Sequence, residues 1–144
     1  MNTLLFPIEK REFAGKRQLL IGLRTLHLIG VSGYAGFFFF DLPVEQWSHL
    51  GLLALVTGLL MLLLEIWSDG IFLLQMRGLA VLLKLAIFGW ILIEPDWRVQ
   101  GFVCIILLAG YFSHAPARIR YYLPFSAVNA SSSAKLRELK GLRS

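Results

Sequence analysis

The stretch that decides the fold is RTLHLIGVSGYAGFFFF, residues 24–40. It carries only two basic side chains, Arg24 and His27, within an apolar run that begins at residue 18. The hydrocarbon core of a bilayer is about 30 Å thick, and a helix of ~20 mostly apolar residues crosses it. The four phenylalanines that end the stretch form an aromatic anchor for the membrane interface, and Pro43 ends the helix. The stretch therefore predicts a membrane-spanning helix with an arginine and a histidine inside it.

Three further apolar runs follow along the chain. The composition agrees with a membrane protein, since 57% of the 144 residues are hydrophobic and only 16% are charged. Within the first run, Ser32 and Gly36 form a small-residue pair that predicts a close contact with another helix. We expect an all-α membrane protein, a four-transmembrane-helix bundle within residues 18–122. The expected spans are residues 18–40, 50–67, 78–93 and 101–114.

The distribution of basic residues predicts the orientation of the bundle. The two loops expected on the outer side, residues 41–49 and 94–100, contain one basic residue, Arg98, whereas Arg77 lies in the inner loop. Cytoplasmic segments of membrane proteins are enriched in Lys and Arg. We therefore expect an N-in/C-in protein of a bacterial inner membrane, with both termini cytoplasmic. The net charge of +5 is assigned to contact with lipid headgroups, so no nucleic-acid partner is expected.

Two basic segments flank the predicted bundle. Residues 1–17 are interpreted as an interfacial N-terminal segment, and residues 123–144 as a basic cytoplasmic tail. In that tail, the sequence AKLRELKGLR predicts a short amphipathic helix capped by Ser133, after a linker. Between the second and third spans, residues 71–76 are too few to cross a bilayer. They predict either an interfacial segment or an extension of the third helix.

Five ionisable side chains are expected in the cytoplasmic half of the bundle. They come from all four spans and are Arg24, His27, Glu65, Lys84 and His114. Each costs about 2.5 to 3.5 kcal/mol to place at the centre of a membrane helix, so such residues face a partner or a cavity. Their concentration in one leaflet predicts a polar cavity. The alternative is a buried charge network that only orients the helices.

The first and fourth spans repeat one pattern in opposite directions. In each, a histidine lies between an arginine toward the cytoplasm and a glycine toward the membrane centre: Arg24, His27 and Gly30, and Arg118, His114 and Gly110. This arrangement suits a b-type haem, with imidazole on the iron, glycine beside the macrocycle and a cation beside a propionate. At 1.5 Å per residue, His27 lies about 15 Å from Arg17 and His114 about 6 Å from Arg118. Either helix tilt brings both imidazoles to one level, or only one of them is a ligand.

Three stretches carry a family resemblance. LRTLHLIGVSGYAGFFF, LAVLLKLAIF and YFSHAPARIRYY are similar to parts of the four-helix copper resistance D family and of the related membrane-bound, haem-containing protoporphyrinogen oxidases. The resemblance implies a four-helix membrane bundle in which His27 is a haem or metal ligand and Lys84 an essential polar partner. The chain departs from the oxidase pattern at Tyr34, where that family has tryptophan. It also has no Met-rich or Cys cluster, the soft ligands that copper prefers.

Three functions follow from these patterns. The first is a small inner-membrane protein whose cytoplasmic-side cavity binds haem b or a metal, with His27 and His114 as ligands and Arg24, Lys84 and Arg118 around the cofactor. The second is a non-catalytic accessory or assembly subunit that packs against other membrane subunits in the bilayer. The third is a protoporphyrinogen oxidase-like enzyme. No residue is assigned as catalytic, and whether the chain is an enzyme stays open.

Overall fold

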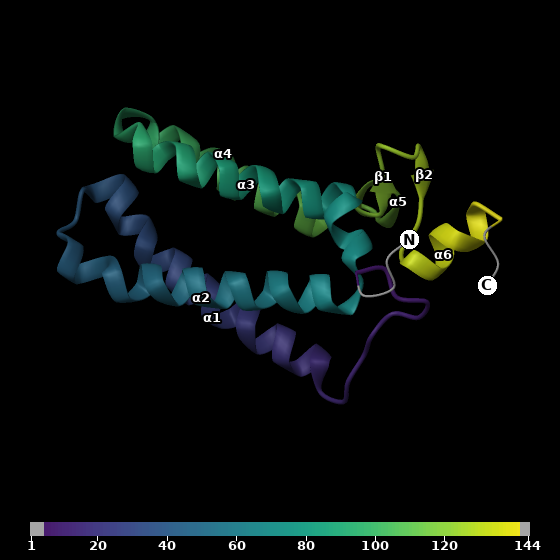
Figure 1. The fold of residues 1–144 in the computed structure, drawn as a ribbon. Coiled ribbons are helices and arrows are strands. Elements are labelled where there is room, and N and C mark those ends of the chain that lie inside the picture. Colours follow the sequence, from purple (N-terminus) through teal and green to yellow (C-terminus); the bar gives the residue numbers. More distant parts are fainter. Residues whose placement is uncertain (1–4, 142–144) are drawn as a thin grey trace. The chain divides into compact units, whose positions relative to one another are not determined.

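A computed structural model describes residues 5–141 of the chain. These residues are mostly helical and divide into two units, one formed by residues 12–65 and the other by the N-terminal segment up to Arg11 together with the chain from Ile66 onward. Each unit is described by itself, and their elements are labelled in Figure 1.

The first unit is a hairpin of two long helices. Helix α1 spans Lys16–Phe40, and α2 spans Val44–Ser68, the last three residues of which belong to the second unit. Asp41, with φ 52°, ends α1 in the left-handed region, and Pro43 follows it. The backbones of the two helices come close at Gly30, where a Cβ would lie 2.6 Å from the backbone nitrogen of Ala54. The close contact predicted at Ser32 and Gly36 is not found there, because Ser32 is exposed and a Cβ at Gly36 would meet only the side chain of Leu42, in the turn.

Aromatic side chains fill the turn end of this hairpin. The ring centroid of Trp47 lies 4.9 Å from that of Tyr34 and 4.6 Å from that of Phe37, and its indole Nε1 donates to the carbonyl of Leu42 at 3.1 Å. Tyr34 and Phe38 are buried and meet edge to face with ring centroids 5.0 Å apart. This cluster fixes how the chain reverses between α1 and α2.

The second unit is built on another helical hairpin, formed by α3 (Met76–Ile93) and α4 (Arg98–His114). A short 3-10 helix, η2 (Pro95–Trp97), joins them, and the rings of Trp90 and Trp97 lie 5.8 Å apart beside it. Gly101 faces the side chain of Ile91 so closely that a Cβ would overlap it. Near the other end of the hairpin, α5 (Ala117–Arg120) follows α4 after a break in the helix.

The prediction of membrane-spanning helices is confirmed for three of the four predicted spans, by length and composition. Among the described residues, α1, α2 and α3 are long and apolar enough to cross a bilayer. Helix α4 forms where the fourth span is predicted, but it has 17 residues. The structure thus shows a helical protein with three helices of spanning length.

The C-terminal tail, predicted as a linker and a short helix, is folded back into the second unit. It forms a two-stranded antiparallel hairpin, β1 (Tyr122–Leu123) and β2 (Val128–Asn129), and then α6 (Ser133–Leu139). The small sheet departs from the expected all-α fold. Helix α6 confirms the predicted tail helix, but its cap is Ser132, whose side chain accepts a hydrogen bond from the backbone N–H of Lys135, and the prediction of Ser133 is wrong.

We use the term "cap" for residues 5–11, 68–75 and 121–139 of the second unit. Two arrangements were predicted for residues 71–76. Residues 71–74 belong to the 3-10 helix η1 (Gly70–Leu74), Gln75 is extended, and α3 begins at Met76. Four buried side chains from distant segments form the core of the cap, and Phe6 and Val128 pack against them: Ile71, Leu123, Ala130 and Leu136.

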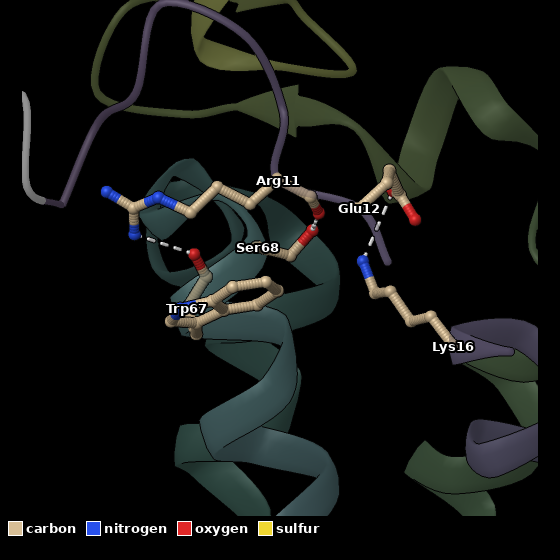
Figure 2. Close-up of polar contacts among 5 residues, drawn as sticks. All are labelled: Arg11, Glu12, Lys16, Trp67 and Ser68. Carbon is tan, nitrogen blue, oxygen red and sulfur yellow. Dashed lines mark hydrogen bonds and ion pairs between the residues drawn. The ribbon is translucent and has the colours of Figure 1, made fainter. Parts of the chain in front are cut away.

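The N-terminal segment is tied to the cap by its backbone. The N–H of Arg11 donates to the carbonyl of Ser68 at 3.0 Å, and the Ser68 hydroxyl donates to the carbonyl of Arg11 at 2.8 Å. Figure 2 shows this pair together with the Arg11 guanidinium, which donates to the carbonyl of Trp67 at 2.9 Å. Nearer the N-terminus, Gly70 N–H donates to the carbonyl of Leu5 at 2.8 Å. The part of the predicted segment 1–17 that comes before residue 5 lies outside the described residues.

Candidate functional site

His27 lies half-buried on α1, against α2. Its Nδ1 is 2.8 Å from the carbonyl oxygen of Ala54 and 3.3 Å from the hydroxyl of Thr57. Thr57 is buried, and its hydroxyl donates to the carbonyl of Leu53 at 2.6 Å. Gly58 leaves room for the imidazole, because a Cβ there would lie 3.0 Å from His27 Cε1. His27 is therefore a point at which α1 and α2 are joined by a polar contact.

The partners of His27 determine its tautomer. A backbone carbonyl can only accept a hydrogen bond, so the short contact to Ala54 requires the proton on Nδ1. In the neutral ring the lone pair is then on Nε2. Metal-binding histidines commonly have this arrangement, in which the nitrogen that does not bind the metal donates to a backbone carbonyl. The donor chemistry of His27 thus fits an Nε2 ligand as well as a purely structural role.

The other predicted site residues occupy both units. Arg24 is exposed on α1, and Glu65 is half-buried near the end of α2 in the same unit as His27. In the second unit, Lys84 is half-buried in α3, and no described residue of that unit makes a hydrogen bond or ion pair with its ammonium group. The convergence of these side chains from the two units stays a prediction.

His114 and Arg118 are not on one continuous helix. Helix α4 ends at His114, and the backbone is extended at Ala115 and Pro116, with ψ of 139° and 154°. Arg118 then belongs to α5, and both His114 and Arg118 are exposed. The predicted spacing, with an arginine one helical turn from each histidine, therefore holds for Arg24 and His27 but is interrupted by the proline in the fourth span.

His27 and His114 are the two predicted metal ligands. Within residues 5–141, no group of three or more His, Cys, Asp or Glu side chains is placed to hold a metal ion. Cys104 is exposed on α4. A b-type haem needs only one or two protein ligands, fewer than such a group supplies.

The carboxylate of Asp69, which none of the site predictions names, joins two parts of the cap. Asp69 is buried, and its carboxylate accepts hydrogen bonds from Ile71 N–H at 3.2 Å and from Ser133 N–H at 2.7 Å. The Ser133 hydroxyl donates to it as well. The carboxylate thus caps η1 and holds the start of α6 at the same time.

Gln75 makes a second link of this kind. Its Nε2 donates to the carbonyl of Ala130 at 2.7 Å, and its Oε1 accepts from Arg77 Nε at 2.7 Å. The Arg77 guanidinium lies 5.0 Å from the ring centroids of both Phe72 and Tyr121. Gln75 therefore connects the tail to α3 and sets the orientation of Arg77.

Part of this network could have been found in the sequence. Ser68-Asp69-Gly70 is a typical turn, and an Asp before a helical segment commonly accepts hydrogen bonds from the following backbone N–H groups. The contact with Ser133 joins residues 64 positions apart, and local pattern gives no signal for such a pair.

The fold defines the chain as a helical integral membrane protein with a folded cap. In comparisons with known protein families, with curated proteins and with solved structures, the chain matches none.

Proposed function

We propose that the chain is a four-span membrane protein with both termini in the cytoplasm of a bacterial inner membrane. The 17 residues of α4 extend over about 25 Å, close to the thickness of the hydrocarbon core. Trp90 and Trp97, at the outer ends of α3 and α4, are typical of the membrane interface. Eight of the ten basic residues that the structure describes in the second unit lie in the cap or within three residues of it along the chain, and this end of the unit then lies on the cytoplasmic side.

Reporter fusions test this topology. A reporter joined to either terminus of the full chain is expected to be active in the cytoplasm, because an even number of spans returns the chain to the side on which it began. A reporter in the loop at residues 94–100 is expected to be active only outside the cytoplasm. Periplasmic activity from one terminus alone would mean an odd number of spans and would contradict the assignment of α4.

Within the membrane, the protein acts as a non-catalytic accessory or assembly subunit. This proposal is supported by the partners of the buried polar side chains, which are groups of the protein itself. Thr57, Ser68, Asp69, Gln75 and Ser133 are all buried, and each hydrogen-bonds backbone or another member of this set. Buried Lys16 pairs with Glu12 at 3.2 Å (Figure 2). Catalytic sites instead direct polar groups toward a substrate. Here the buried polar groups support the architecture.

The His27 geometry favours a second candidate, a haem b or metal site. The bond from Nδ1 to the Ala54 carbonyl would hold the imidazole and direct its basic nitrogen, Nε2, toward an iron or another metal. A bound haem would supply redox or ligand-binding chemistry. The role of this chain would be to orient the ring and, through Arg24, to neutralise a propionate. The same residues would serve an oxidase-like enzyme, which stays a third possibility.

One purification distinguishes these functions. The full chain is extracted from its native membrane in a mild detergent, and its size and absorption spectrum are measured. An accessory subunit is expected to elute in a complex larger than its monomer and to show no Soret band. Elution as a monomer with no Soret band would contradict the accessory role and leave the second candidate without support.

If a Soret band is found, two His27 variants show whether His27 is the haem ligand. His27→Ala removes the imidazole and its helix contact, which we expect to weaken the α1–α2 association by about 1 kcal/mol. His27→Asn keeps an N–H donor for the Ala54 carbonyl but has no imidazole. A band lost in both variants and retained in His114→Ala would establish His27 as the ligand. Turnover of protoporphyrinogen would be needed to assign the enzyme.

A further inference from the structure

We propose that Arg77 and Arg120, which border the cap, and Tyr121 within it bind the phosphate of an anionic phospholipid, with Phe125 inserted into the neighbouring bilayer surface. The inference rests on the proposed function in one respect, because it requires the cap to lie at the membrane surface. It adds a ligand class and a site to that function.

The first observation is a pair of arginines on one aromatic ring. The guanidinium carbon of Arg77 lies 5.0 Å from the ring centroid of Tyr121, and that of Arg120 lies 5.7 Å from the same centroid. Both are within the range of a cation–π interaction, and Phe72 covers Arg77 as well. Arg77 is held further by the 2.7 Å bond from its Nε to Gln75. Two positive charges thus lie against one aromatic ring.

The second observation is the charge of the cap and of the residues joined to it. Over residues 5–11, 66–77 and 115–141 the chain has eight basic and three acidic side chains. Two of the acidic groups are engaged elsewhere, Asp69 with Ser133 and Glu138 with Lys135 at 3.0 Å. Among the described residues, no group accepts a hydrogen bond from the Nε of Arg120, which is buried. The local excess of positive charge attracts an anion, and arginine pairs are well suited to phosphate oxygens.

The third observation is an apolar tip on the β1–β2 hairpin that follows Tyr121. Strand β1 starts directly after Tyr121, and the loop that joins β1 to β2 carries Phe125, which is 77% exposed. The β1–β2 hairpin projects sideways from the end of the α3–α4 hairpin (Figure 1). An exposed aromatic ring next to cations is typical of a segment at the membrane interface. A soluble anion has no apolar part that could contact Phe125, whereas a phospholipid presents a phosphate and apolar chains together.

Lipid binding to the purified full chain tests the site. The protein, in a neutral detergent, is titrated with phosphatidylglycerol and with phosphatidylcholine of the same acyl chains, and the bound lipid is counted by native mass spectrometry. We expect the phosphatidylglycerol to bind at least tenfold more tightly, since the zwitterionic lipid has no net charge. Equal binding of the two lipids would overturn the proposal.

Matched variants locate the binding. Arg77→Gln with Arg120→Gln is expected to weaken phosphatidylglycerol binding about thirtyfold, because each cation near an anionic surface contributes about a factor of five. Lys135→Gln with Lys140→Gln removes the same charge from α6 and is expected to change the affinity less than threefold. An equal loss in both pairs would mean diffuse attraction to the whole cap and would also overturn the site.

Two more measurements complete the test. If the glutamine pair does not fold, Arg77→Lys with Arg120→Lys keeps the charge but not the planar stack, and its affinity is expected to be lower than that of the wild type. Inorganic phosphate in excess is expected to leave the lipid bound, and full displacement by it would indicate a site for free phosphate. Lipid binding is measured on the isolated chain, so a failure to bind phosphatidylglycerol does not contradict the accessory role. In the same way, evidence against the accessory role does not change the measured lipid affinity.

Discussion

Asp69→Ala is expected to release the C-terminal tail from the cap while leaving the membrane helices in place. The substitution removes the only group that accepts hydrogen bonds from both η1 and Ser133 among the described contacts of the cap, and it leaves two buried donors of Ser133 without that acceptor. Hydrogen bonds to a charged group contribute about 1.5 to 3 kcal/mol each, so we expect opening of the tail to become easier by about 3 kcal/mol. Limited trypsin digestion at Lys135 and Arg137 would then be roughly a hundredfold faster.

A graded series and a matched control make this result specific. Ser133→Ala removes one donor and is expected to cost about 1 kcal/mol. Asp96→Ala removes the same charge from an exposed position in η2, at the far end of the α3–α4 hairpin, and is expected to leave tail cleavage unchanged. If the tail of Asp69→Ala resists trypsin as well as the wild type, the carboxylate does not hold the cap together.

Gly30→Ala is expected to separate α1 from α2. The new Cβ would lie 2.6 Å from Ala54 N and 2.8 Å from the carbonyl oxygen of Leu50, and both atoms belong to the backbone of α2. Neither can move without shifting the helix, so we expect a loss of about 2 kcal/mol in hairpin stability. Hydrogen–deuterium exchange of the detergent-solubilised full chain, followed in peptides from α1 and α2, measures the effect as faster exchange.

The same helix offers the control for this substitution. A Cβ at Gly22 would meet no atom within 4 Å, so Gly22→Ala changes the helix propensity of α1 without a clash. We expect it to leave exchange unchanged or to slow it, because alanine favours a helix over glycine by up to about 1 kcal/mol. Equal exchange rates in the two variants would show that the Gly30 contact does not set the stability of the hairpin.

The helices were predictable because their physical cause is local. Apolar runs and their flanking signals, such as Pro43 and the Pro95 turn, placed all four long helices near their observed positions. Helix α4 begins three residues before the predicted fourth span, at Arg98, and ends with it at His114. The cap was not predicted because residues 121–141 contain no long apolar run. Its core forms only when Ile71, Leu123 and Leu136, which are far apart in the sequence, come together.

The candidate site was predictable in part for the same reason. His27 was singled out because an ionisable residue in an apolar helix needs a partner, and the structure supplies one in the Ala54 carbonyl. The sequence could not show that this partner is backbone, since every residue has a carbonyl. Asp69 and Gln75 lie outside the spans, so insertion cost gave no reason to select them. Their importance comes from contacts with Ser133 and Ala130, far away along the chain.

The link between Asp69 and Ser133 also sets an order of events during synthesis. Ser133 is made 64 residues after Asp69, later than every long helix. During synthesis, the Asp69 carboxylate in the turn after α2 is therefore made before Ser133, whose N–H and hydroxyl later donate to it. The cap can close only after α4 and the start of α6 have been made. The cap is thus the part of this protein that is assembled last, after every long helix has been made.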